Sequence, residues 1–308
     1  MFLGIDTSNY TTSLALFDGE TVVQEKQLLD VKQGERGLRQ SDALFKHTVN
    51  LPVLMDKLAP NFYEKIEGVG VSVRPRNIEG SYMPCFLAGA ANAKSISVTS
   101  NIPMYETSHQ IGHLLAALYS ADKLDLIERP FLAFHVSGGT TDALLVKPDK
   151  DEILDAQLIA QSLDLKAGQA VDRAGVMMGL QFPAGKELDR LAQSADKTYK
   201  IKPSMKGCDC SLSGVENKCR QMLESGESKQ NIARYCIEYI LATLDEMTSR
   251  LLNEYGTMPV VFAGGVMSNS IISKRLSEKY GAYFAKPEFS CDNAAGVAIS
   301  AYLKHNSR

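Results

Sequence analysis

The chain has 308 residues, of which 44% are hydrophobic and 22% are charged, and its formal net charge is −3. That charge excludes a strongly basic nucleic-acid binder for the chain as a whole, although a local basic patch is compatible with it. No apolar run approaches the ~20 residues of a membrane span, so we expect no membrane association. The opening residues lack the basic and apolar regions of a secretory signal. We therefore expect a cytoplasmic protein whose six cysteines are reduced.

The first part of the chain alternates between strand and helix patterns. Alternating apolar residues and small polar turns predict strands at residues 2–5, 13–17, 22–29, 68–73 and 102–105. The apolar period of residues 41–58 predicts a helix that is interrupted near Pro52, and residues 83–96 predict a second helix rich in small side chains.

Two of the five histidines lie four residues apart, at His109 and His113. Thr107 and Ser108 are suitable N-cap residues for a helix that starts here. Four-residue spacing places both imidazoles on one face of that helix, where they are able to bind a single metal ion. The alternative at this point is that the two residues simply begin a helix.

The opening hairpin pattern returns 129 residues later. Ser8-x-x-Thr11-Thr12 matches Ser137-x-x-Thr140-Thr141, and the apolar run of residues 14–17 matches residues 143–146. This repeat predicts a duplicated domain rather than one continuous sheet. Both turns are rich in hydroxyl groups or glycine, which suits them to holding phosphate through backbone N–H groups.

The second half is expected to be mainly helical around a few strands. Strands are predicted at residues 131–136, 143–146 and 259–263, and helices at 163–180, 186–195, 232–255, 271–280 and 293–304. Residues 197–218 are rich in lysine and are interpreted as a surface excursion. Within it, Cys208 and Cys210, with Cys219 just beyond, are either scattered thiols or a metal site without a recognised spacing.

Further polar features point to a nucleotide site. Gly264-Gly265 follows a predicted strand and precedes a helix, where glycine allows a nucleoside to approach the backbone. Asp6 ends the first strand, where its carboxylate is able to hold a metal ion or a water molecule. The two polar turns and the Gly-Gly pair together indicate ATP bound between two duplicated halves; the alternative is that the turns are merely tight hairpins.

The motifs of nearly the whole chain resemble the TsaD family of tRNA threonylcarbamoyl-transfer enzymes, formerly labelled glycoproteases. The resemblance is carried by Gly4-Ile-Asp-Thr-Ser8, Gly80-Ser81, Ala93-Lys94, His109-x-x-x-His113, Val136-Ser-Gly-Gly-Thr-Thr141, Gly168-x-Ala170-x-Asp172, Phe182-Pro-Ala-Gly185, Asp189, Gly264-Gly-Val-Met-Ser-Asn269 and Cys291-Asp-Asn-Ala-Ala295. It implies an α/β protein of the actin-like ATPase (ASKHA) fold, with two duplicated RNase-H-like halves around a nucleotide cleft. The expected halves are residues 1–128 and 129–292, with a C-terminal helix at 293–308 that packs back on the first half.

The same resemblance implies a role for each motif. One divalent metal, iron or zinc, is expected on His109, His113 and Asp292. The expected substrate and nucleotide residues are Ser137, Gly138, Gly139, Thr140, Asp172, Gly185, Asp189, Gly264, Gly265 and Asn269. Expected ligands are ATP, AMP or an acyl-adenylate; expected partners are tRNA, TsaB- or TsaE-like proteins, or a second copy of the chain. The implied reaction transfers a threonylcarbamoyl group from its adenylate to adenosine of tRNA.

Three departures from the family pattern indicate a divergent paralogue. Asn9-Tyr10 replaces an acidic motif, Arg74-Pro75-Arg76 replaces Gly-Pro-Gly, and Thr140-Thr141-Asp142 replaces His-Thr-Gln. The two arginines either bind a carboxylate or phosphate or lie on the surface. An acceptor other than tRNA, or a nucleotide-binding scaffold, is therefore an alternative function. Peptidase activity is not expected, because Gln110 stands where zinc proteases carry a glutamate.

Overall fold

The structure, a computed structural model, describes residues 1–8, 10–30 and 38–307. Asn9, part of one departure from the family pattern, lies outside the described residues. The chain divides into two units, of which unit 1 comprises residues 1–128, 147–156 and 288–308, and unit 2 comprises residues 129–146 and 157–287. None of the described helices combines the length and the apolar composition needed to cross a bilayer.

Unit 1 is built on a five-stranded sheet with the spatial order β3-β2-β1-β4-β5. The strands are β1 (Phe2–Asp6), β2 (Thr11–Phe17), β3 (Val22–Leu28), β4 (Gly68–Arg74) and β5 (Met104–Ser108). β1, β2 and β3 pair antiparallel, whereas β1, β4 and β5 run parallel. β1 is buried along its whole length, as expected for a central strand covered on both faces.

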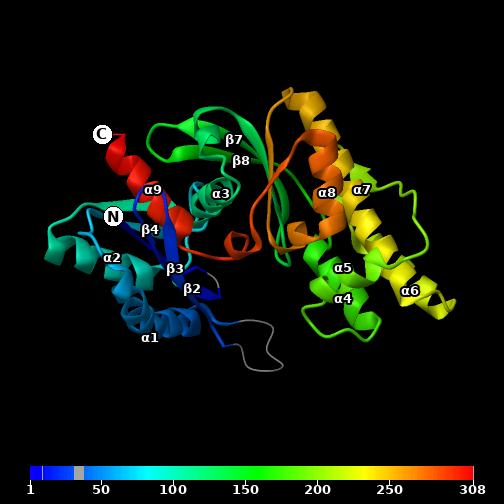
Figure 1. Cartoon of the computed structure of the whole chain (residues 1–308), viewed down its shortest axis with the longest axis horizontal. Coiled ribbons are helices and arrows are strands. Elements are labelled where there is room, and N and C mark those ends of the chain that lie inside the picture. Colours follow the sequence, from blue (N-terminus) through cyan, green and yellow to red (C-terminus); the bar gives the residue numbers. More distant parts are fainter. Residues whose placement is uncertain (9, 31–37, 308) are drawn as a thin grey trace. The chain divides into compact units, whose positions relative to one another are not determined.

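Helices cover both faces of this sheet. They are α1 (Gln40–Leu58), α2 (Phe86–Ser100), α3 (His109–Ser120) and α9 (Ala295–Asn306). Ile5 packs in a core with Leu51 and Leu54 of α1, whereas Phe2 contacts Tyr302 of α9. Because residues of opposite parity point to opposite faces of a strand, α1 and α9 lie on opposite sides of the sheet. The C-terminal helix thus packs against β1 and β4 near the start of the chain (Figure 1).

Unit 2 carries a second five-stranded sheet, in the order β12-β11-β6-β7-β8. Its strands are β6 (Phe131–Val136), β7 (Thr141–Asp149), β8 (Ile153–Gln161), β11 (Val260–Ala263) and β12 (Tyr283–Phe284); the tip of the β7–β8 hairpin belongs to unit 1. The helices are α4 (Ala167–Met177), α5 (Gly185–Gln193), α6 (Ser213–Glu224), α7 (Lys229–Tyr255) and α8 (Ser270–Tyr280), and β9 (Ser204–Lys206) pairs with β10 (Asp209–Ser211). These helices and β6 share one large apolar core with β11.

The structure confirms the duplication predicted from the 129-residue repeat. In the first hairpin Phe2 pairs with Phe17, and the residues 129 positions later, Phe131 and Val146, pair in the second. The correspondence holds along both strand pairs, and the two sheets have the same strand order. The repeated sequence therefore encodes a repeated antiparallel β-meander followed by two parallel strands.

Two sequence predictions are wrong. The helix of residues 40–58 is continuous, because Leu51 before Pro52 and Leu54 and Leu58 after it pack into the same core. That burial outweighs the ~3 kcal/mol cost of an interior proline. The surface excursion at 197–218 also includes β9, β10 and the first half of α6, where Val215 is fully buried, as is Cys219 just beyond. The strand β8 had no counterpart in the prediction.

Candidate metal centre and anion-binding turn

The two histidines are positioned by the first turn of α3. The Ser108 hydroxyl accepts a hydrogen bond from the N–H of Ile111 at 3.3 Å, so Ser108 is the N-cap that the sequence predicted. α3 consequently begins at His109, and His113 follows one turn later on the same face.

Asp292 reaches these histidines because α3 and α9 pack closely in unit 1. A Cβ atom on Gly296 of α9 would lie 1.8 Å from the carbonyl oxygen of Gly112, so no other residue fits there without a backbone shift. Asn293 fixes the loop before α9: its Oδ1 accepts the N–H of Ala295 at 3.0 Å, and its Nδ2 donates to the carbonyl of Cys291 at 2.7 Å. Neither Gly296 nor Asn293 was identified as functional in the sequence, although both lie in or next to the motif around Asp292.

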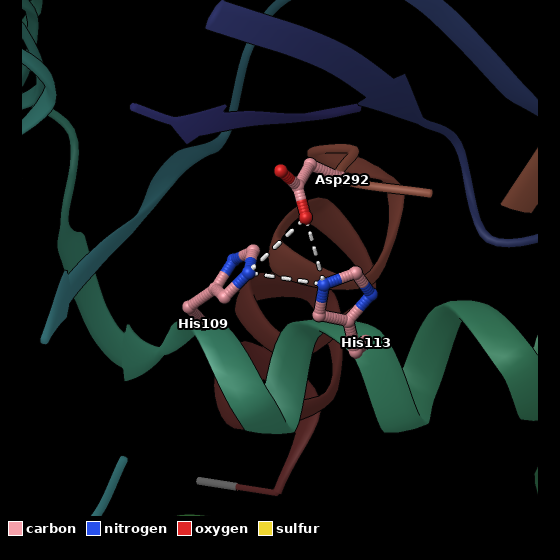
Figure 2. Close-up of side chains that lie close together, drawn as sticks. All are labelled: His109, His113 and Asp292. Atoms are coloured by element: carbon pink, nitrogen blue, oxygen red, sulfur yellow. Dashed lines mark hydrogen bonds and ion pairs between the residues drawn. The ribbon is translucent and has the colours of Figure 1, made fainter. Parts of the chain in front are cut away.

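The side chains of His109, His113 and Asp292 converge at one point (Figure 2). His113 Nε2 lies 3.0 Å from His109 Nε2 and 3.2 Å from Asp292 Oδ1, and His109 Nε2 lies 3.5 Å from the same oxygen. Ligand atoms held about 2.1 Å from one metal ion lie about 3 to 3.5 Å apart, so the triangle fits a single ion. Two imidazoles and a carboxylate suit iron(II) or zinc, and three protein ligands leave positions open for substrate.

Asp6 lies outside this triangle but touches it from the other side of His109. Its Oδ2 is 2.7 Å from His109 Nδ1, and its Oδ1 accepts the N–H of Ser8 at 2.7 Å. The Ser8 hydroxyl is 3.4 Å from His109 Nε2. Asp6 therefore contacts the imidazole rather than the position of the ion, whereas the sequence suggested that its carboxylate holds a metal ion or water.

The electrostatics of the three residues favour a cation. Burial lowers the pKa of His109, but the carboxylates of Asp6 and Asp292 outweigh that effect and raise it to about 10. Burial likewise opposes ionisation of Asp292, yet hydrogen bonds from His109 and His113 hold the pKa of its carboxyl well below the usual range. The buried carboxylate of Asp6 and the half-buried carboxylate of Asp292 thus favour a compensating positive charge, which a proton on His109 or a divalent cation supplies.

The turn at residues 137–140 in unit 2 is open rather than buried. Ser137 Oγ accepts the N–H groups of Gly139 at 3.3 Å and Thr140 at 3.1 Å. Gly138 and Gly139 are exposed, and a Cβ atom on either would meet nothing within 4 Å. The N–H of Gly168, in the first turn of α4, donates to the carbonyl of Ser137 at 3.0 Å. The positive end of a helix therefore lies behind a turn with accessible glycines, an arrangement that suits an anion.

The remaining predicted nucleotide residues form smaller groups in unit 2. Asp189 accepts hydrogen bonds from Asn269 Nδ2 at 2.9 Å and from both the N–H and the hydroxyl of Ser270. Asp172 Oδ1 instead accepts the N–H of Ala184 at 2.8 Å, directly before Gly185, where α5 begins. Asp189 also lines an open pocket of about 680 Å³ formed by α5 and the segment that precedes it.

The Gly264-Gly265 pair lies next to the strand that leads into the open turn. Gly264 has φ +102°, and a Cβ atom there would lie 2.3 Å from the carbonyl oxygen of Val136. Gly265 begins a short 3-10 helix. Gly264 therefore needs to be glycine because it packs closely against Val136 at the end of β6, one residue before Ser137.

The arginines that depart from the family pattern are engaged within unit 1. The Arg74 guanidinium donates to Glu152 Oε1 at 2.7 Å and to Asn77 Oδ1 at 2.9 Å. Lys304 Nζ donates to the other oxygen of Glu152 at 2.9 Å. Arg74 is therefore paired with a carboxylate of the protein itself. The backbone N–H of Arg76 donates to the Ser81 hydroxyl at 3.0 Å.

The cysteines form no second metal centre in the described part of the chain. Cys210 and Cys219 are completely buried in the apolar core of unit 2, and Cys208 donates to a carboxylate oxygen of Glu254 at 3.4 Å. Among the residues that the structure describes, His109, His113 and Asp292 are the one group of His, Cys, Asp or Glu placed to share an ion. The three thiols are thus scattered, which was the simpler of the two interpretations.

Comparison with known proteins gives the same picture over nearly the whole chain. The family model described as "TsaD: tRNA N6-adenosine threonylcarbamoyltransferase" matches residues 25–299. Curated relatives named tRNA N6-adenosine threonylcarbamoyltransferase include those of Kosmotoga olearia, 30% identical over 98% of this chain and 92% of the relative, and of Thermosipho africanus, 28% identical over 97% and 93%.

Solved structures show the fold. Full-length HypF in its phosphate- and nucleotide-bound form is 14% identical, with a TM-score of 0.61 over 99% of this chain and 55% of that chain. Component A of (R)-2-hydroxyglutaryl-CoA dehydratase from Acidaminococcus fermentans is 17% identical, with a TM-score of 0.55 over 99% and 98%. With the two matching sheets, these likenesses confirm the predicted actin-like ATPase fold.

Proposed function

The chain belongs to the TsaD family of tRNA N6-adenosine threonylcarbamoyltransferases, and we propose that it transfers a threonylcarbamoyl group to an adenosine of tRNA with the help of one divalent metal ion. The observation that carries the metal-dependent part is the triangle of His109, His113 and Asp292, whose donor atoms fit one ion. A peptidase is not supported, because Gln110 occupies the place of the glutamate base between the histidines of zinc proteases.

The proposed donor is threonylcarbamoyl-adenylate. The amine of the target adenosine forms a bond to the carbamoyl carbon and gives up one proton to water, the bond from that carbon to the phosphate oxygen breaks, and AMP leaves with the electron pair. A bound metal would supply Lewis-acid stabilisation of negative charge on the acyl or phosphate oxygens. We assign phosphate binding to the turn Ser137–Thr140 and nucleoside binding to Asp172, Gly185, Asp189 and Asn269.

The residues present favour tRNA over the alternative acceptors. In the sequence, a different acceptor is favoured by Arg74, Arg76 and Thr140. Of these, Arg74 has its guanidinium engaged by Glu152 within unit 1. A scaffold without activity would have no use for three converging metal donors. TsaB- or TsaE-like partners and a second copy of the chain stay predictions.

An assay with defined components tests the function. Purified protein, Fe²⁺ or Zn²⁺, threonylcarbamoyl-adenylate and a tRNA transcript should yield threonylcarbamoyladenosine, measured by mass spectrometry of the digested tRNA. Omitting tRNA and supplying small amines or a protein instead tests the other acceptors. Product on those acceptors but none on tRNA, with either metal and with partner proteins added, would contradict the proposal.

A further inference from the structure

Asp6 is a buried carboxylate that uses both of its oxygens. It ends β1, is 1% exposed, and pairs across the sheet with Ser13 of β2. Its Oδ1 accepts the N–H of Ser8 at 2.7 Å and its Oδ2 lies 2.7 Å from His109 Nδ1. An ionised carboxylate only accepts hydrogen bonds, so the proton between Asp6 and His109 belongs to the imidazole.

That interaction decides which ring nitrogen of His109 is free to bind a metal. With Nδ1 carrying the shared proton, Nε2 is the nitrogen left with a lone pair, and Nε2 is the atom that lies 3.0 Å from His113 Nε2. We infer that Asp6 is the positioning residue of the metal centre, which holds His109 in the orientation and tautomer that direct Nε2 to the ion. This inference rests on the proposed metal-dependent function and gives Asp6 a role distinct from those of the three ligands.

The surroundings of Asp6 are suited to positioning. β1 is the central strand of its sheet, hydrogen-bonded to β2 on one side and β4 on the other. The next residue, Thr7, donates from its hydroxyl to the carbonyl of Cys85 and accepts the N–H of Gly89, which fixes the strand end to α2. Two negative carboxylates, Asp6 and Asp292, also balance the charge of a divalent ion, which lowers the cost of burying it.

The substitution Asp6→Asn separates positioning from packing, because it keeps the volume and removes one acceptor. If the amide oxygen stays on the Ser8 N–H, the amide NH₂ faces His109 Nδ1, which must then accept, and the ring proton moves to Nε2 and blocks the metal. If the amide is flipped, two donors face each other at Ser8. Neither orientation reproduces the native hydrogen bonds, so we expect Zn²⁺ affinity to fall about 10- to 100-fold, as for other residues that orient metal-bound histidines.

The test uses the full chain and Zn²⁺ alone, with affinity measured by competition against a chelator and folding by circular dichroism. Ser13→Ala is the matched control: Ser13 Oγ donates to the backbone carbonyl of Asp6 at 3.4 Å, so its removal disturbs the same strand end without touching the carboxylate. We expect Ser13→Ala to bind Zn²⁺ like the unmodified chain. Nitrogen-15 NMR of the Zn²⁺-loaded, unmodified chain should show His109 bound through Nε2 with a protonated Nδ1.

Each measurement either supports or contradicts the positioning role of Asp6. Unchanged affinity in Asp6→Asn, or an equal decrease in Ser13→Ala, would overturn the positioning role. If Asp6→Asn does not fold, the NMR of the unmodified chain decides, and coordination through Nδ1 would refute the inference. An unmodified chain that binds no Zn²⁺ or Fe²⁺ would overturn the metal-dependent function as well, whereas normal binding with an unaffected Asp6→Asn leaves that function standing.

Discussion

The hairpins β1–β2 and β6–β7 share one backbone plan and carry different chemistry. Their cross-strand pairs correspond residue by residue at a spacing of 129. At the end of β1, Asp6, Thr7 and Ser8 are buried, and Asp6 contacts a metal-site histidine. After β6, Gly138 and Gly139 are exposed. The two hairpins thus share the same strand pairing, and they differ in the residues that pack against the end of the first strand of each hairpin.

The neighbours of the two strand ends explain the difference. In unit 1 the end of β1 meets His109 of α3, so a buried carboxylate there is compensated by an imidazole. In unit 2 the turn after β6 contacts the amino end of α4 at Gly168. The partial positive charge of that helix end attracts an anion, and Gly138 and Gly139 in the turn leave space for it. The end of one hairpin therefore suits the proposed cation site, and the end of the other suits the proposed phosphate site.

The largest effect is expected on metal affinity at the candidate metal centre of unit 1. Asp292→Ala and His113→Ala each remove one of the three proposed metal ligands, so metal affinity should fall by several kcal/mol, on the scale of metal-site energies. The variants should stay folded, because the cores of this chain do not depend on one ion. Metal analysis of the purified proteins, together with the transfer assay, measures the result.

The two variants separate the roles of the residues. Full metal occupancy in Asp292→Ala would remove Asp292 from the site, and full occupancy in His113→Ala would end the metal hypothesis in this form. Circular dichroism of the same proteins serves as the control, since a folded variant without metal assigns the loss to the site and not to the fold.

The substitution Gly138→Ala tests whether the turn after β6 binds phosphate. The added methyl meets no protein atom within 4 Å and the backbone φ is not positive, so the fold should tolerate it. The methyl would, however, occupy space on the exposed side of the turn to which phosphate binding is assigned. We expect ATP or AMP affinity to fall about tenfold, or about 1.4 kcal/mol, in calorimetry.

The matching control for that turn is metal content, which should not change in Gly138→Ala. Gly264→Ala should behave differently, because its Cβ would lie 2.3 Å from the Val136 carbonyl at a positive φ, and we expect lower stability there. Equal nucleotide affinity in Gly138→Ala and the unmodified chain would exclude the turn as the phosphate site.

The lysine-rich segment, residues 197–218, is the proposed tRNA-binding surface of unit 2. Tyr199 and Met205 pack inward, whereas Lys200, Lys202 and Lys206 are exposed, the alternation of an extended segment. Changing those three lysines to glutamate should weaken tRNA binding and make it less dependent on salt. The log–log slope of affinity against salt should shrink by about 0.7 to 0.9 for each phosphate that the variant no longer neutralises. Filter binding at several salt concentrations measures both effects.

Charge reversal elsewhere provides the control for the segment. Lys274→Glu changes an exposed residue of α8 and should leave tRNA affinity nearly unaltered. Lys197 is a poorer candidate than its neighbours, because its ammonium pairs with Glu227 at 2.6 Å. Binding that does not respond to salt, or to the three substitutions, would place tRNA elsewhere.

The smallest effect concerns the hairpin tips. Asp18 accepts the N–H groups of Glu20 and Thr21 after β2, and Asp149 accepts those of Asp151 and Glu152 after β7. The tips share this turn chemistry.

Among the described residues, the second tip alone adds an ion-pair cluster, in which Glu152 joins Arg74 and Lys304. Because Glu152 is 28% exposed, Glu152→Gln should cost about 1 kcal/mol of unfolding free energy or less. Urea denaturation compares it with Glu79→Gln, an exposed site outside the cluster. A decrease above about 3 kcal/mol would contradict this view of a screened surface network.

The sequence by itself determined the repeated hairpins, most helices and the pairing of His109 with His113. Each of these follows from local period or spacing, which the backbone imposes on any neighbouring residues. Asp292 entered through the resemblance of motifs, since 178 residues separate it from His113 and no local pattern links them. The helix α6 was missed although Val215, Cys219 and Met222 have helical spacing, because the lysine-rich composition before it concealed the period.

Tertiary structure alone decided what the side chains at the strand ends do. Asp6 is a plausible metal ligand in the sequence, yet the sheet and α3 bring it to Nδ1 of His109, on the far side of the ring from Asp292. Arg74 is a candidate substrate ligand in the sequence, yet the β7–β8 tip supplies Glu152 to neutralise it. Such assignments depend on which distant segments share one place in space, and short-range patterns of residues hold no information about that.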